Sequence, residues 1–206
     1  MRLLVLCFLL PLLLSCSHGN EIKDGDLLFV TEDSSNLSEA INRVTQTSLK
    51  TNYCHVAIIR IEQDSIWVLE STTKYGSRKI LLEDFIKEQN SDIYRYRLKK
   101  EYAESIEKAW DNAGDMLGKL YNFSYQLNDT SYYCSDFIYR LFANDSVFEL
   151  NPMTFIDPQT GVIDSGWQEY YDNLGMEVPQ GEPGCNPNGL AKSEKLDFLG
   201  KLPLKQ

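Results

Sequence analysis

Histidine is scarce in this sequence, because the 206 residues contain only two, His18 and His55. No clustered set of His and Cys residues shows the spacing that metal sites require. A metal centre of that kind is therefore excluded, and we expect no metal and no organic cofactor. Any acid–base step that needs an imidazole must use one of these two residues.

Positive charge is also in short supply. Lys and Arg number 20 against 30 Asp and Glu, which gives a formal net charge of −10, and no basic cluster is present. A nucleic acid is therefore excluded as a partner, since phosphate binding needs a basic face. Internal repeats and low-complexity tracts are absent. With 43% hydrophobic and 24% charged residues, the composition predicts one globular domain with a real core.

The N-terminal apolar run, residues 3–14, follows Arg2 and is too short to span a bilayer comfortably. Such a run is typical of a secretory signal peptide. The segment Leu13-Leu14-Ser15-Cys16 resembles a bacterial lipobox, in which the signal is cleaved before a cysteine that then carries a lipid. A plain signal peptide cleaved nearby is the alternative, and it implies the same export step.

We therefore predict a signal peptide over residues 1–15, a lipidated tether over 16–21 with the lipid on Cys16, and a single domain over 22–206. The expected location is the bacterial cell envelope, with the protein anchored to a membrane on the periplasmic or outer-membrane side. Cys54, Cys134 and Cys185 then remain in the domain. In an oxidising compartment this odd number leaves at least one free thiol and allows a Cys54–Cys185 bridge without requiring one.

The hydrophobic pattern predicts mixed α and β structure. A turn at residues 24–26 leads into a buried strand, and a long helix is expected over 101–120. From Asn144 onward Pro and Gly are frequent, so we expect a loop-dominated segment. The other expected elements are a helix capped by Ser35 or Asn36 with Leu37, Ala40, Ile41 and Val44 inward, a hairpin of 53–60 and 66–70 turning at Gln63-Asp64, a short helix around 82–86 and a strand over 92–98.

Residues 132–142, YYCSDFIYRLF, place Cys134 where a short amphipathic helix begins. Phe137, Ile138 and Leu141 share the inward face with it. The unpaired N–H groups and the positive dipole end of a helix N-terminus favour a thiolate. Cys134 is therefore a candidate nucleophile. The alternative is a small buried hydrophobic residue, the commoner fate of a cysteine.

His55 is the only plausible base, because His18 lies in the tether two residues after Cys16. Strand alternation places Cys54 on the opposite face from His55, which argues against Cys54 as its nucleophile. The hairpin brings Glu70 close to His55, where a carboxylate would orient the imidazole. Glu62 ranks lower because it lies near the turn. The alternatives are a structural histidine and an ordinary solvated glutamate.

The order of four segments resembles the circularly permuted branch of the NlpC-type papain-like hydrolases, the YiiX/YaeF-like amidases. The match runs over roughly residues 22–200 and rests on Gly25-Asp26-Leu27-Leu28-Phe29, His55-Val56-Ala57-Ile58, Val68-Leu69-Glu70 and Tyr133-Cys134-Ser135-Asp136. The histidine strand precedes the cysteine helix, which is the permuted order. The resemblance implies an α+β fold in which an antiparallel sheet packs against the helix that carries the cysteine.

Carried over residue by residue, the resemblance implies Cys134 as nucleophile, His55 as general base and acid, and Glu70 as the residue that orients His55. It also implies Tyr133 and Ser135 as substrate-binding residues and the Cys134 N–H as an oxyanion donor. Asp26 would hold a turn that closes the site, and Asp136 stands where the family pattern has a glutamate.

The predicted function is an exported, lipid-anchored cysteine hydrolase that opens an amide bond through a thioester. Its substrate would be a peptide, a cell-wall fragment or an acylated small molecule. The alternatives are a lipid or N-acyl-amine hydrolase or acyltransferase, and a non-catalytic lipoprotein that binds wall or lipid fragments.

Overall fold

The computed structural model describes residues 21–31, 36–45 and 47–203, with only the backbone described at 36–38. The expected signal peptide, Cys16, His18 and the cap candidate Ser35 lie outside these residues. Within them, no helix is both long and apolar enough to cross a bilayer.

The strands are β1 (Leu27–Thr31), β2 (Tyr53–Glu62), β3 (Ser65–Thr72), β4 (Gly76–Leu81), β5 (Ile93–Leu98), β6 (Leu120–Tyr121), β7 (Ser131–Tyr132), β8 (Asn151–Pro152), β9 (Pro183–Gly184) and β10 (Leu196–Lys201). The α-helices are α1 (Asn36–Thr45), α2 (Leu82–Glu88), α3 (Glu104–Met116), α4 (Cys134–Leu141), α5 (Ser165–Leu174) and α6 (Pro187–Ala191).

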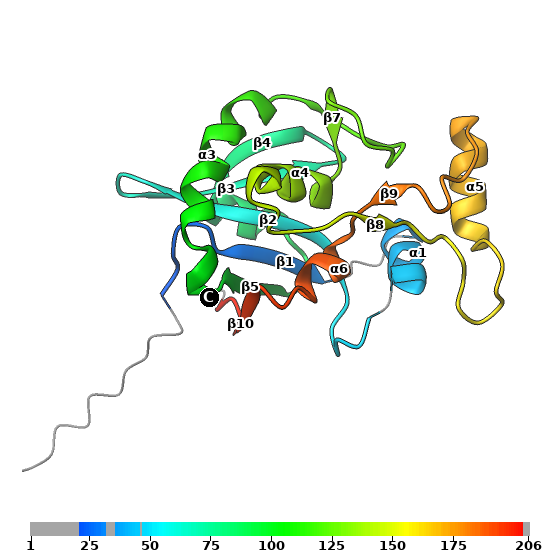
Figure 1. Ribbon diagram of the computed structural model, residues 1–206, viewed down its shortest axis with the longest axis horizontal. Helices are drawn as coiled ribbons and strands as arrows, with labels where there is room; N and C mark the ends of the chain where they lie inside the picture. The colour runs from blue at the N-terminus through cyan, green and yellow to red at the C-terminus, as the bar shows by residue number, and fades with distance from the viewer. Residues whose placement is uncertain (1–20, 32–35, 46, 204–206) are drawn as a thin grey trace, which may run out of the picture.

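Six strands form one antiparallel sheet in the order β10-β5-β1-β2-β3-β4 (Figure 1). The predicted hairpin is confirmed, since β2 and β3 pair from Ile58 with Leu69 to Glu62 with Ser65. Gln63 takes a left-handed φ of 54° in the two-residue turn, a conformation that such tight turns require. This hairpin fixes the positions of His55 and Glu70 relative to each other.

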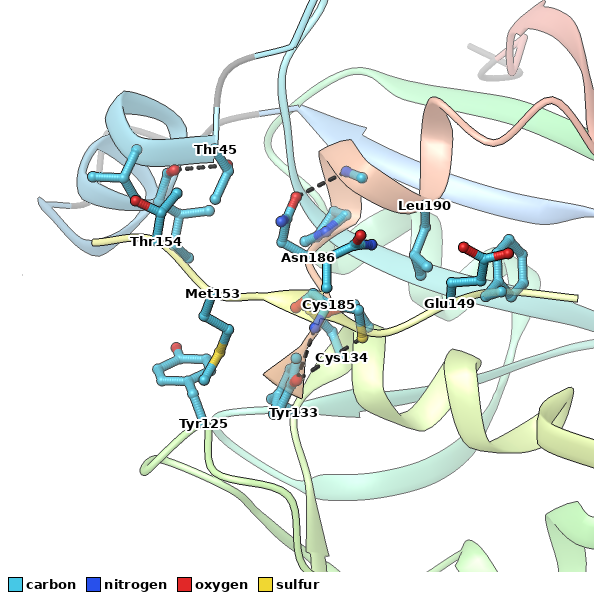
Figure 2. Close-up of a pocket in the computed structure, with 18 of the residues that line it drawn as sticks. Thr45, Tyr125, Tyr133, Cys134, Glu149, Met153, Thr154, Cys185, Asn186 and Leu190 are labelled. Atoms are coloured by element: carbon cyan, nitrogen blue, oxygen red, sulfur yellow. Dashed lines mark hydrogen bonds between the residues drawn. The ribbon is translucent and has the colours of Figure 1, made fainter. Parts of the chain in front are cut away.

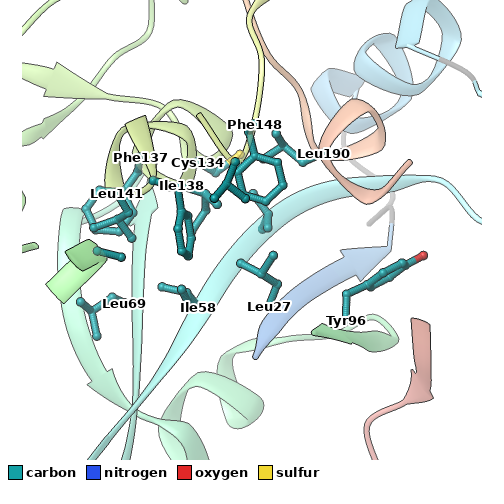
Figure 3. Packing of buried hydrophobic residues seen from close by; sticks show 14 of the residues in the cluster. Leu27, Ile58, Leu69, Tyr96, Cys134, Phe137, Ile138, Leu141, Phe148 and Leu190 are labelled. Carbon is teal, nitrogen blue, oxygen red and sulfur yellow. The ribbon is translucent and has the colours of Figure 1, made fainter. Parts of the chain in front are cut away.

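The two faces of the sheet are covered by different helices. Alternate residues of β1, β2 and β3, among them Leu27, Ile58 and Leu69, pack beneath the α4 residues Phe137 and Ile138 (Figure 3). Both α4 side chains are fully buried, and each such burial contributes about 1.5–3 kcal/mol. The opposite face packs on α2, largely through Phe85. Helix α4 is thus held against the sheet by the apolar face that its sequence predicts.

The long helix is shorter than predicted. Helix α3 ends at Met116 rather than continuing to residue 120. Gly118 adopts a left-handed φ of 75°, which directs the chain out of the helix. Leu120, the last residue of the predicted helix, is 78% exposed and belongs to β6. The hydrophobic spacing continues beyond Met116, so it does not mark where the helix ends.

The expectation of a loop-dominated segment from residue 144 is only partly right. The segment contains α5, α6 and β10, and β10 pairs with β5 to form one edge of the sheet. Asp164 caps α5 by accepting hydrogen bonds from the N–H groups of Gly166 at 2.9 Å and Trp167 at 3.2 Å. Arg43 of α1 also donates to Asp164, at 2.8 Å. Pro and Gly frequency marks the turns here but does not show where the chain pairs between them.

A buried ion pair fixes the point where the described chain enters the sheet. Asp26, fully buried, accepts hydrogen bonds from Arg97 Nε at 2.6 Å and Arg97 Nη2 at 2.9 Å. Arg95 and Arg97 also donate to the carbonyl oxygen of Glu21, at 3.0 and 2.9 Å. Asp26 precedes β1, whereas His55 pairs with Val30 at the other end of that strand. The expectation that the Asp26 turn closes the site is therefore wrong.

Candidate active site

A β-bulge in β2 brings His55 to the site. Val30 of β1 pairs with His55, but the next pair joins Thr31 to Tyr53, so Cys54 is an extra residue in β2. Tyr53 and Val56, three positions apart, consequently both lie in the core beneath α4. Strict alternation fails here, and Cys54 and His55 line the same cavity. The prediction that they occupy opposite faces is wrong.

His55 and Glu70 are in direct contact. The distance from His55 Nε2 to Glu70 Oε2 is 2.7 Å, and the Glu70 side chain is fully buried. Glu62, the lower-ranked candidate, lies at the turn and pairs with Lys79 and Arg60 instead. The structure therefore brings together the histidine and the carboxylate that the hairpin argument selected.

Arg78 completes the contacts of Glu70, and the sequence analysis missed it. Arg78 lies directly opposite Glu70 in the β3–β4 register, and its Nε and Nη2 are 2.8 and 2.6 Å from Oε1. The sequence of β4, GSRKIL, shows no clear strand alternation, so the sequence alone does not place Arg78 opposite Glu70. Only a predicted second hairpin after Thr72 would have paired Arg78 with Glu70 across neighbouring strands.

Cys134 is the first residue of α4, and its side chain is buried. Its thiol interacts electrostatically with His55, and both residues line the same cavity. Since Nε2 of His55 contacts Glu70, Nδ1 is the nitrogen left for the thiol. Cys134 Sγ also lies 4.0 Å from the carbonyl oxygen of Cys54. Thiol, imidazole and carboxylate therefore lie around one cavity.

The electrostatics favour an ionised His55–Glu70 pair. Burial lowers the pKa of His55, but hydrogen bonds to Cys134 and Glu70 outweigh burial and raise it to about 10. Burial raises the pKa of Glu70, yet its contacts with His55 and Arg78 more than offset this and hold it below its ordinary value. A protonated imidazole beside an ionised carboxylate is the arrangement that stabilises a neighbouring thiolate.

Tyr133 and Ser135, predicted to bind substrate, both line a cavity and also hold the segment around Cys185 (Figure 2). Ser135 Oγ donates to the Cys185 carbonyl at 3.1 Å, and the Cys185 N–H donates to Tyr133 Oη at 3.2 Å. Burial raises the pKa of the Cys185 thiol to about 12, and this thiol forms no disulfide in the described structure. The Cys54–Cys185 bridge that the sequence allowed is likewise not formed.

Asp136, the position that departs from the family pattern, is fully buried in the first turn of α4. Its Oδ1 accepts a hydrogen bond from Arg140 Nε at 2.8 Å, while Oδ2 has no partner among the described residues. Burial raises the pKa of Asp136 to about 6 even though Arg140 lowers it. The short side chain therefore pairs along its own helix.

Two cavities meet at Cys134. The first, of about 420 Å³, is largely apolar and aromatic (Figure 2). The second, of about 440 Å³, has polar and charged walls. Residues that line the first include Tyr125, Met153, Phe155, Trp167 and Leu190, and those of the second include His55, Glu70, Lys74, Arg78 and Glu88. Cys134 lines both, so a bond attacked by its thiol would lie where the two cavities join.

Comparison with known families identifies this arrangement. Residues 21–200 match the model of the permuted papain-like amidase enzymes, YaeF/YiiX, C92 family. The chain belongs to this family. The predicted family, the permuted papain-like α+β fold and the cysteine amidase type of hydrolase are thereby confirmed.

A solved structure has the same fold as this amidase. The structure of metalloprotein YiiX from Escherichia coli O157:H7 superimposes with a TM-score of 0.70 at 22% identity, covering 85% of this chain and 95% of the YiiX chain. No curated protein matches the chain. The residues described for this amidase include no group of three or more His, Cys, Asp or Glu side chains placed to hold a metal ion.

Proposed function

We propose that this amidase hydrolyses an amide bond between an apolar acyl group and a polar amine, with Cys134 as nucleophile. The observation that carries the proposal is the position of the Cys134 thiol, which shares a cavity with His55 and lies where an apolar cavity and a polar cavity join. The acyl chain would occupy the apolar cavity and the amine the polar one.

The reaction follows from the contacts of His55. The Cys134 thiolate attacks the carbonyl carbon, and the Cys134 backbone N–H stabilises the developing oxyanion. The His55 imidazolium protonates the nitrogen as the C–N bond breaks, which leaves a thioester and a free amine. His55 then takes a proton from water, the resulting hydroxide attacks the thioester, and the C–S bond breaks. Glu70 orients the ring throughout, as its 2.7 Å contact with Nε2 suggests.

The apolar lining favours acyl amides over the wall peptides that the compartment also suggests. Each buried methylene is worth about 0.8 kcal/mol, so kcat/KM should rise by about fourfold per methylene until the cavity is full. A series of N-acyl amides of increasing chain length, assayed beside purified muropeptides with products identified by mass spectrometry, tests this. Cleavage of muropeptides with no gain along the acyl series would contradict the proposal.

Met153 offers a way to test the acyl cavity. Its half-buried side chain lines the cavity beside Gly184, opposite Tyr133. Met153→Trp should narrow the cavity and lower kcat/KM for long acyl chains while leaving short ones near wild type. Met176→Trp, on a partly buried methionine that does not line either cavity, is the matched control.

We also propose that the mature protein is a lipoprotein anchored through Cys16. The support is the apolar run and the lipobox-like Leu13-Leu14-Ser15-Cys16. Cells grown with a clickable palmitate analogue should label the wild-type protein and not Cys16→Ser. Equal labelling of the two proteins would show that Cys16 does not carry the lipid.

A further inference from the structure

The two oxygens of Glu70 have separate partners. Oε2 faces His55 Nε2 at 2.7 Å, while Oε1 accepts from Arg78 through Nε at 2.8 Å and Nη2 at 2.6 Å. Two N–H groups of one planar guanidinium converge on Oε1, so Arg78 holds this oxygen and leaves Oε2 for the imidazole. The orientation of Oε2 toward the imidazole therefore depends on what holds Oε1.

We propose that Arg78 is a positioning residue of this hydrolase, which aims Glu70 at His55 and keeps Glu70 ionised. The inference rests on the proposed roles of Cys134, His55 and Glu70. Arg78 itself would not touch the reacting atoms.

Arg78 is itself held on two sides. Its guanidinium lies 4.1 Å from the centre of the Tyr75 ring, and its Nη2 is 2.5 Å from Glu88 Oε2 at the end of α2. The Arg78 side chain is only 18% exposed, so solvent screens its contact with Glu70 little. Stacking on Tyr75 and pairing with Glu88 hold the Arg78 guanidinium in one position relative to Glu70.

The charges around Glu70 show why this contact matters. A fully buried carboxylate is costly unless it is paired, and the groups that face it are His55 from β2 and Arg78 from β4. Cys134 from α4, Glu88 from α2 and Lys74 from the β3–β4 turn lie beyond them around the same cavity. Without Arg78, Glu70 would protonate more readily, and a neutral Glu70 stabilises the imidazolium less. The pKa of His55 would then fall, because ionised Glu70 is one of the groups that raise it.

The test compares Arg78→Gln and Arg78→Lys with the wild type. In the wild type, kcat/KM should stay high into alkaline solution and fall as the pH passes about 10, where His55 loses its proton. Arg78→Gln should move this alkaline limb to lower pH and reduce kcat at neutral pH by up to about a hundredfold, with KM little changed. Arg78→Lys keeps the charge without the two-point contact, so its values should lie between the other two.

Arg60→Gln is the matched control. Arg60 also combines an ion pair, 3.1 Å to Asp24, with a stacked ring, 4.6 Å to Trp110, but it lies toward the turn end of β2. Its loss should lower the melting temperature and leave the alkaline limb in place. The rate of Cys134 alkylation by iodoacetamide, followed at the Cys134 peptide across pH, provides a readout independent of the substrate.

Each outcome separates the two proposals. If Cys134→Ala is inactive but both Arg78 variants keep the wild-type alkaline limb and alkylation profile, Arg78 has no positioning role and the proposed function stands. If Cys134→Ala retains activity, the proposed function itself fails. Should Arg78→Gln not fold, the Arg78→Lys profile decides, and a limb identical to the wild type overturns the inference.

Discussion

Replacing Cys134 with alanine should lower kcat by at least about a thousandfold, since loss of the nucleophile removes the whole covalent pathway. The side chain is buried in the core beneath α4, so alanine leaves only a small cavity and the protein should still fold. Amide hydrolysis measured at saturating substrate, with circular dichroism to confirm the fold, provides the comparison. Mass spectrometry should detect a trapped thioester in the wild type and none in the variant.

Cys54 provides the control for the Cys134→Ala variant, because it is the other thiol that lines both cavities. The bulge places it in both cavities beside Cys134, which the sequence analysis did not expect. Cys54→Ala should change kcat by less than about tenfold, as expected for a wall residue without a general base. A severe loss of kcat in Cys54→Ala, together with an active Cys134→Ala, would show that Cys54 is the nucleophile.

The second large effect is expected at Glu70, where one substitution should reduce both stability and activity. Glu70→Gln removes the charge from a fully buried carboxylate that contacts His55 and Arg78. Breaking such a buried pair typically costs about 3–5 kcal/mol of unfolding free energy. The His55 ring also loses the charge that favours its protonated form, so kcat should fall by about a hundredfold to ten-thousandfold. Urea unfolding and steady-state kinetics measure the two losses separately.

Asp26 provides the matched control, because it is another fully buried carboxylate held by a two-point arginine contact. Asp26→Asn should lose a comparable amount of stability. Since Asp26 lies at the opposite end of β1 from His55, kcat per folded molecule should stay near wild type. A kinetic defect of the same size in both variants would show that Glu70 acts only through stability.

Much of the candidate site was predictable because it depends on local rules. The two-residue turn at Gln63-Asp64 fixes the hairpin, and the hairpin brings Glu70 to His55. The apolar spacing after Cys134 fixes which face of α4 meets the sheet. In each case a short-range pattern determines the geometry, and the sequence states that pattern directly.

The features that the sequence did not predict depend on contacts between segments far apart in the chain. The bulge at Cys54 reflects pairing with β1, more than twenty residues earlier, and no composition signal marks it. Arg78 matters because β4 pairs with β3, and its sequence, GSRKIL, shows too weak an alternation to announce a strand. The C-terminal strand β10 reaches the sheet edge about a hundred residues after its partner β5. These features follow from the tertiary arrangement and not from local propensity.

If Cys16 carries a lipid, as we propose, the contacts of Arg95 and Arg97 with the carbonyl oxygen of Glu21 fix the point of the fold to which the anchor is joined. The described chain enters the fold beside Asp26, and β1 runs from there toward the side of the molecule that carries α1 and α5 (Figure 1). Residues of both helices line the apolar cavity, and Ile41 of α1 also lines the polar cavity. A lipid on Cys16 would be only five residues from Glu21, a span of at most about 18 Å. The Asp26 end would then face the bilayer and the opening at Cys134 would face the aqueous compartment. In that arrangement we expect substrates to reach Cys134 from the aqueous compartment.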